Sequence, residues 1–251
     1  MEGGIHVALK PEVIGTLAGI PITNSLVTSW AVIALLALIA VLMSRRAGLI
    51  PGTFQTVIEW GFEYVYDYVV EVLESRELGA KFFPLVMTIF LFIFTANLLE
   101  YMPGIGSIGF FKPGEFIPLL RSVNTDLNVT LALAAISFFV IEVAGFAALG
   151  AVKYMGKFIN FSGGFIGFAV GLVEMIGEFA RLISLSFRLF GNIIAGEVLI
   201  IVAMFFVPYF GPVPLMMFEL FIGFLQAAIF ALLTLFFIKL AITEPHAAES
   251  H

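Results

Sequence analysis

The chain has 251 residues, of which 61% are hydrophobic and 12% charged, with a formal net charge of −6. Soluble domains carry about 25% charged residues, so this composition indicates a polytopic membrane protein and excludes an ordinary soluble one. Without cysteine, disulfides and thiolate chemistry are excluded. The histidines stand only near the termini, at His6, His246 and His251, so none serves as a base or metal ligand within a span. We expect no metal, cofactor or nucleic-acid partner.

Long runs without charge predict the first membrane spans, because a transmembrane helix needs about 20 apolar residues. Three are expected before the long C-terminal run, at residues 26–43, 82–101 and 127–151. Residues 54–77 differ, because apolar residues recur there at helical spacing while acidic residues fill the other side. This pattern predicts an amphipathic helix on the membrane surface or against a partner.

The apolar run at residues 165–207 allows two interpretations. As one helix its 43 residues would be about 65 Å long, whereas the hydrocarbon core is about 30 Å thick, so a single crossing must be strongly tilted or bent. Alternatively, two ordinary spans could meet at Gly191-Asn192, a turn-type dipeptide. A last helix follows at residues 215–241.

The lysine and arginine bias gives the orientation, because cytoplasmic loops are enriched in these residues. With an external N-terminus and a single crossing over residues 165–207, seven basic residues face the cytoplasm: Arg45, Arg46, Arg76, Lys81, Lys153, Lys157 and Lys239. Three face outward, at Lys10, Lys112 and Arg121. The bias therefore predicts an external N-terminus and a cytoplasmic C-terminus, although two spans would move Lys239 outside.

Polar residues in the long run fall on one helical stripe. At 100° per residue, one face carries Glu174, Arg181, Ser184, Arg188 and Asn192. Glu178 also lies in this segment. Glu174 and Arg181 could be a structural ion pair, and in the preceding span Glu142 could pair with a base or snorkel.

Arg188 is the hardest of these to explain as structural. Its guanidinium stays protonated, and a charge near the bilayer centre costs about 2.5–3.5 kcal/mol on insertion scales. Glu197, nine residues on, lies about half a turn away, so it is no obvious partner. The pattern predicts that Arg188 meets a carboxylate of another chain.

Two acids on neighbouring helices suggest a proton relay. In the last helix Glu219 and Gln226 are seven residues apart and share a face. A carboxylate on each of two helices, Glu197 and Glu219, could serve one aqueous path. Asn192 and Gln226 could equally be ordinary hydrogen-bonding contacts between helices.

The segments SFRLFGNIIAGE (residues 186–197) and FLQAAIFALLT (residues 224–234) closely resemble subunit a of F-type ATP synthases. ANLLEYMPG (residues 96–104) is similar to its N-x-x-(D/E)-x-x-P segment, and TDLNVTLALA (residues 125–134) to the stretch that opens its next helix. The resemblance implies a single all-α membrane domain over residues 1–251. It has about five spans and one amphipathic surface helix, and its last two helices are long and strongly tilted.

The resemblance also implies the roles of the site residues. Arg188 corresponds to the family's essential arginine, and the other polar positions matched are Asn192, Glu197, Glu219 and Gln226. The position of Glu219 is a histidine in some relatives, so two carboxylates share the relay here. Candidates for the cytoplasmic half-channel are Glu174, Glu178, Arg181 and Ser184.

The expected role is that of a non-catalytic stator subunit in the bacterial inner membrane. It provides proton half-channels to a rotor ring of c subunits and contacts the b subunits of the peripheral stalk. The alternative function is a stand-alone ion channel or secondary transporter. No internal repeat or TVGYG-type filter supports that alternative.

Overall fold

The structure is a computed structural model. It describes residues 11–17, 19–46, 48, 52–102, 108–112, 115–158, 164–208 and 210–243. The three histidines and Lys10 lie outside these residues.

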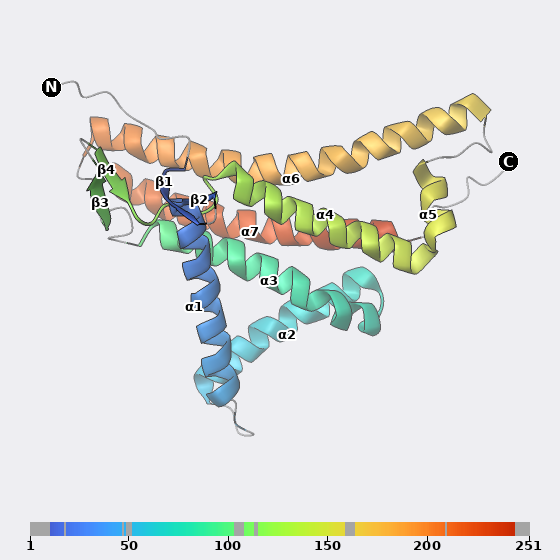
Figure 1. Cartoon of the computed structure of the whole chain (residues 1–251). Helices are drawn as coiled ribbons and strands as arrows, with labels where there is room; N and C mark the ends of the chain where they lie inside the picture. Colours follow the sequence, from blue (N-terminus) through green and yellow to red (C-terminus); the bar gives the residue numbers. More distant parts are fainter. Residues whose placement is uncertain are drawn as a thin grey trace.

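Seven helices make up most of the described chain: α1 (Asn24–Arg46), α2 (Thr53–Leu73), α3 (Arg76–Glu100), α4 (Leu127–Leu149), α5 (Ala151–Phe158), α6 (Gly164–Phe206) and α7 (Pro212–Ile242). Helices α3, α4, α6 and α7 pack side by side as the main bundle, and they run across the view in Figure 1. Helix α1 runs down that view and contacts α3 near its own first turns, while α2 reaches back from the end of α1 to α3. Helices that cross in this way cannot all follow the membrane normal.

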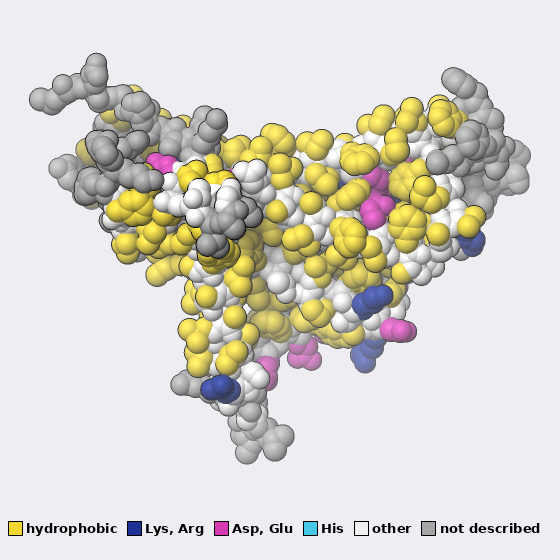
Figure 2. All heavy atoms as spheres, in the orientation of Figure 1, with side chains coloured by type: hydrophobic (Ala, Val, Ile, Leu, Met, Phe, Trp, Pro, Cys, Tyr) yellow, Lys and Arg dark blue, Asp and Glu magenta, His cyan; other side chains and the backbone are white. Residues whose placement is uncertain are grey.

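Five helices are long and apolar enough to cross a membrane among the described residues: α1, α3, α4, α6 and α7. Their outer faces carry exposed leucine, isoleucine, valine and phenylalanine, and Figure 2 shows a largely hydrophobic surface with charge in a few small groups. Such a surface is stable only in lipid or against other apolar chains. The chain is therefore an all-α, polytopic membrane protein.

The run at residues 165–207 forms one uninterrupted helix, α6, of 43 residues. Gly191 and Asn192 lie inside it, so the break that their sequence allowed does not occur. Helix α7 begins at Pro212, which suits a first helical position because proline has no N–H to leave unpaired. It packs along α6, α4 and α3, and this sandwiched position buries one side of α7.

Local signals set the helix boundaries. The amphipathic segment predicted over residues 54–77 ends earlier, at Leu73, because Glu74 adopts a left-handed φ of 54°. Ser75 then caps α3 by accepting a hydrogen bond from the Leu78 N–H. Asp126 caps α4 in the same manner, through the Asn128 N–H.

Two features have no counterpart in the sequence-based expectation. Two short antiparallel hairpins, β1 (Val13–Leu17) with β2 (Ile20–Thr23) and β3 (Gly109–Lys112) with β4 (Glu115–Pro118), lie at one end of the bundle. The short helix α5 follows α4 after Gly150, whose φ of 79° turns the chain. Strands of four or five residues give too little alternation to be recognised.

Helix α5 folds back onto α4 through a glycine. The ring of Tyr154 is fully buried and lies where a Cβ at Gly145 would be. Tyr154 also packs on Phe146, with ring centroids 4.6 Å apart. The missing side chain of Gly145 therefore fixes where α5 lies.

Gly145→Ala is expected to destabilise the protein by about 1–3 kcal/mol, because the added methyl group overlaps Tyr154. Thermal unfolding in detergent, followed by circular dichroism, measures the change. Gly156→Ala in α5 is the matched control, since its Cβ meets no atom within 4 Å. An equal effect of both substitutions would contradict the proposed packing.

Candidate functional site

Arg188 lies on the exposed face of α6. Its closest polar contact among the described residues is the Ser184 Oγ, 3.5 Å from Nη2. No described carboxylate lies within 4.0 Å of it, in contrast to Arg181 and Lys157. Arg188 therefore presents an uncompensated positive charge on the outside of this subunit.

A cavity of about 260 Å³ connects Arg188 with Arg181 along α6 and α7. Gly177, Ala180 and Ser184 form its α6 side, while Leu233 and Phe237 contribute from α7. Three small side chains thus leave an open path beside two arginines. Of the five polar residues predicted on one face, Arg181, Ser184 and Arg188 line this cavity.

Asn192 and Gln226 join α6 to α7. The Asn192 Nδ2 donates to the Gln226 Oε1 at 2.9 Å. Asn192 is exposed while Gln226 is only 3% exposed, so the bond links the outer face to the interior. The pair therefore forms a hydrogen-bonding contact between helices, which was one of the two interpretations of the sequence. Asn192 also lies one turn from Arg188 on the same helix.

Glu219 is buried between α7 and α6 at a glycine. Its carboxyl group lies where a Cβ at Gly196 would be, and its Oε2 is buried with no hydrogen-bond partner among the described residues. Gly196 immediately precedes Glu197. The Glu219 carboxyl group therefore contacts α6 one residue before Glu197.

Asn97 of α3 fixes α7 next to this site. Its Nδ2 donates to the Gly223 carbonyl at 2.9 Å, and its Oδ1 accepts from the Asn124 Nδ2 at 2.6 Å. Gly223 allows the approach, because a Cβ there would lie 3.0 Å from the Asn97 Cβ. All three residues are buried, so the bonds are shielded from solvent.

Glu100 is a third acid in this region, and the sequence reasoning did not place it there. Its carboxylate accepts from the Ser122 Oγ at 2.7 Å and lies within electrostatic range of Glu197, Glu219 and Arg121. A signal was present, because Glu100 is the acidic position of ANLLEYMPG. Its approach to α6 and α7 depends on tertiary packing and could not be read from helical angles.

The remaining candidates form an ion-pair network at the other end of α6. Lys157 Nζ lies 3.1 Å from carboxylate oxygens of both Glu174 and Glu178, and Arg181 lies 2.8 Å from Glu178. Glu174 and Arg181 are not paired with each other, because residues seven apart on a helix lie about 10 Å apart along its axis. Arg181 pairs instead with Glu178, three residues before it on the helix.

Glu142 is bound to a phenol and not to a base. The Tyr154 hydroxyl donates to its Oε2 at 3.1 Å, and its Oε1 is buried without a partner among the described residues. Burial, with the neighbouring Glu142 carboxyl as a second cause, raises the pKa of Tyr154 well above its usual range. Tyr154 therefore stays a hydrogen-bond donor at neutral pH.

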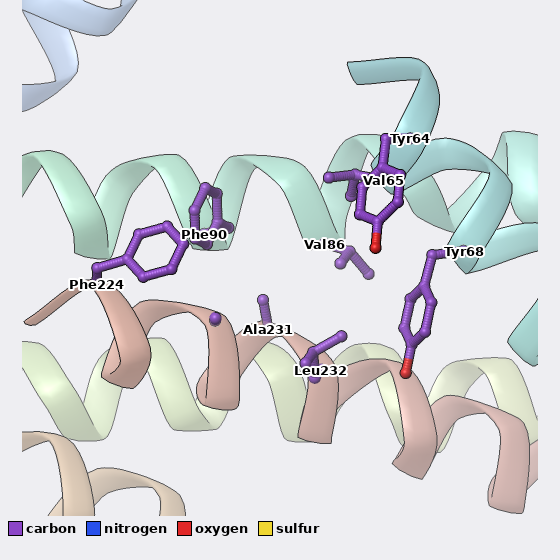
Figure 3. Close-up of a pocket in the computed structure, with 9 residues that line it drawn as sticks. Tyr64, Val65, Tyr68, Val86, Phe90, Phe224, Ala231 and Leu232 are labelled. Atoms are coloured by element: carbon purple, nitrogen blue, oxygen red, sulfur yellow. The ribbon is translucent and has the colours of Figure 1, made fainter. Parts of the chain in front are cut away.

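A separate cavity of about 350 Å³ lies between α2, α3 and α7. Tyr64 and Tyr68 extend from α2 at one end of it, and Phe90 and Phe224 lie together at the other end (Figure 3). The described residues that line it carry no charge. Among the described residues, no group of three His, Asp or Glu side chains could hold a metal ion.

The family model described as ATP synthase A chain matches residues 26–239. The chain belongs to the ATP synthase subunit a family. It is similar to ATP synthase subunit a of Geotalea daltonii, with 32% identity over 225 residues that cover 89% of each chain. The corresponding protein of Moorella thermoacetica is 29% identical over 230 residues, which cover 92% of this chain and 95% of that one. The chain is thus a multi-pass membrane subunit of an ATP synthase complex.

Asn97→Leu is expected to lower stability, because it leaves the buried Asn124 amide without its partner and removes the hydrogen bond from α3 to the Gly223 carbonyl of α7. An unsatisfied buried group costs about 1–3 kcal/mol, so the free energy of unfolding of the purified subunit, measured by thermal unfolding, should fall by about that amount. Thr88→Ala is the control, since its exposed hydroxyl bonds only to the Pro84 carbonyl of its own helix. Comparable stability of the two variants would argue against a role for Asn97 in holding α7.

Proposed function

We propose that this subunit a provides two proton half-channels to a rotor ring and that Arg188 separates them. The observation that carries the proposal is the unpaired Arg188 on the open face of α6. Its charge cannot be removed by deprotonation. A carboxylate brought by another chain is the group that would satisfy it, and a ring of c subunits with one acid each supplies such groups in turn.

The open face supports close approach of a rotor helix. Gly177 and Gly191 have no atom within 4 Å of the position of a Cβ, and Ala195 is exposed. Small residues let the backbones of membrane helices come close. The rotor helix would therefore pass directly over Arg188.

The outer half-channel consists of the acids gathered near Gly196. Glu197, Glu219 and Glu100 lie on three helices, and Asn192 with Gln226 extends the polar groups towards Arg188. Neighbouring acids disfavour joint ionisation, so one acid at a time would hold a proton and pass it on. This arrangement takes the place of the histidine found in some relatives.

The cytoplasmic half-channel follows the cavity from Arg188 to Arg181. Ser184 lines it, and Glu178 and Glu174 lie at its far end through their ion pairs. A ring carboxylate that has lost its proton to this path would pair with Arg188 before it takes up the next proton. The arginine charge favours the ionised carboxylate and repels a proton that would pass directly between the half-channels.

The driving force is the membrane potential, about 2.3 kcal/mol per charge per 100 mV, together with the proton gradient. The chain itself performs no covalent chemistry in this scheme. In this proposal the chain spans the bacterial inner membrane and contacts the b subunits of the peripheral stalk, with its N-terminus outside and its C-terminus in the cytoplasm.

Arg188→Ala in the assembled complex should abolish both ATP synthesis and ATP-driven proton pumping, because nothing then displaces the proton or separates the two paths. Arg188→Lys should not restore them, since lysine lacks the planar fork and can deprotonate when buried. Arg76→Ala, which removes another exposed arginine, is the control and should retain activity. Normal coupled synthesis by Arg188→Ala would falsify the proposal.

Glu219→Gln should slow proton uptake from outside by roughly tenfold or more while the complex still assembles, because an amide cannot relay a proton. The measurement is ATP-driven pumping and potential-driven flux in vesicles. Glu63→Gln on the exposed side of α2 is the matched control. An unchanged rate would remove Glu219 from the relay.

A stand-alone channel or transporter is the competing function. It requires proton flux from the purified chain in liposomes without a rotor. The proposed function expects none, because neither half-channel crosses the whole membrane.

A further inference from the structure

Helix α5 is locked against both α4 and α6. Tyr154 occupies the space beside Gly145 of α4, and the Phe158 carbonyl lies where a Cβ at Gly171 of α6 would be. Both contacts require glycine on the facing helix. The last turn of α5 is therefore held against the cytoplasmic part of α6, which fixes the backbone of Lys157.

Lys157 reaches from α5 into the end of the proposed cytoplasmic path. Its side chain is only 13% exposed, and its Nζ lies 3.1 Å from both Glu174 and Glu178. The rings of Tyr154 and Phe158 flank the ammonium at 5.9 Å and 5.6 Å from their centroids. Lys157 is therefore an interior contact between α5 and α6 and not a surface charge. Together, Lys157, Glu174 and Glu178 form a clamp between the two helices.

The clamp is connected to the cavity beside Arg188. The Glu178 side chain, 5% exposed, also binds Arg181 at 2.8 Å. The Arg181 guanidinium lies over the ring of Phe237 at 5.1 Å, and both residues line the cavity that ends at Arg188. The contacts thus run from α5 through Glu178 to the path that the ring carboxylate would use.

Charge in this network is balanced. Two acids, Glu174 and Glu178, face two bases, Lys157 and Arg181. Removing one charge from a partly buried set leaves the opposite charge uncompensated, and proton uptake or release is the cheapest way to restore neutrality. Loss of the positive charge at position 157 would therefore leave Glu174 and Glu178 with only the charge of Arg181.

We propose that Lys157 is a positioning residue of the cytoplasmic half-channel, which fixes Glu174 and Glu178 and sets the pH range in which this end of the path exchanges protons with the cytoplasm. The inference rests on the proposed function. Among the described residues, the charged or titratable groups that face Glu178 are Glu142 of α4, Tyr154 and Lys157 of α5, and Glu174 and Arg181 of α6. On the side of α7, the uncharged Phe237 packs against Arg181.

The test uses inside-out vesicles with the assembled membrane sector, so that the cytoplasmic face meets the buffer. Potential-driven proton flux is measured while the buffer pH is varied and the internal pH is fixed. For Lys157→Gln the midpoint of the pH dependence should move upward by about one unit or more, because the remaining negative charge favours proton binding. Lys157→Arg should restore the wild-type midpoint.

Glu174→Gln is the reciprocal variant. It leaves an excess positive charge, so its midpoint should move downward. Lys81→Gln, which removes an exposed lysine over the Phe82 ring, is the matched control and should not move it. Opposite shifts from opposite charges cannot arise from a loss of packing alone.

A reduced flux with an unmoved midpoint in Lys157→Gln would overturn the inference and leave Lys157 a purely structural residue. If the complex with Lys157→Gln does not assemble, the Glu174→Gln variant tests the inference in its place. An unmoved midpoint of its pH dependence would overturn the inference. The Arg188→Ala experiment is independent of this one. Coupled synthesis in Arg188→Ala rejects the proposed function, whereas its loss together with an unmoved midpoint rejects only the role of Lys157.

Discussion

The uncompensated charge of Arg188 is the constraint on which the other features of the site depend. A guanidinium keeps its proton under all relevant conditions, and in lipid it must be met by an anion, by water or by both. Within the described subunit it has only the Ser184 hydroxyl at 3.5 Å. The subunit is therefore electrostatically incomplete on this face, and the small residues around Arg188 leave room for the partner that completes it.

Two other basic groups, Lys157 of α5 and Arg181 of α6, follow the opposite rule. Lys157 and Arg181 are each paired with acids at 2.8–3.1 Å, and their network is closed within the subunit. A balanced network is rigid, because every charge that moves leaves another unpaired. An unbalanced charge can exchange partners. One helix thus carries both kinds of group, a fixed network at one end and an exchangeable site near its middle.

Helical angles predicted what lies on one helix. The Arg188 face and the shared face of Glu219 and Gln226 follow from 100° per residue, and both are found in the structure. Contacts between helices were harder to predict from the sequence. Lys157 was not among the predicted site residues, because α5 is too short to show a helical pattern. Glu100 was not among them either, because only the packing of the helices brings it near the acids of α6 and α7. The residue pattern alone left open the choice between one and two spans, since a Gly-Asn pair occurs in turns and in helices alike. The family resemblance favoured one long helix, which the structure shows.

Glycine positions explain how acids could be brought together without strong attractive contacts. Glu219 lies at Gly196, Asn97 at Gly223, Tyr154 at Gly145 and the end of α5 at Gly171. At Gly196, Gly145 and Gly171 a polar or aromatic group lies where the missing Cβ would be, and at Gly223 the Asn97 side chain lies in close contact with that position. The same glycine therefore fixes both the distance between the helices and the place of the facing group. Acids that share a site repel one another when both are ionised. Steric placement by glycine confines Glu219 at the contact of α6 and α7, so its position does not depend on a hydrogen bond to its Oε2.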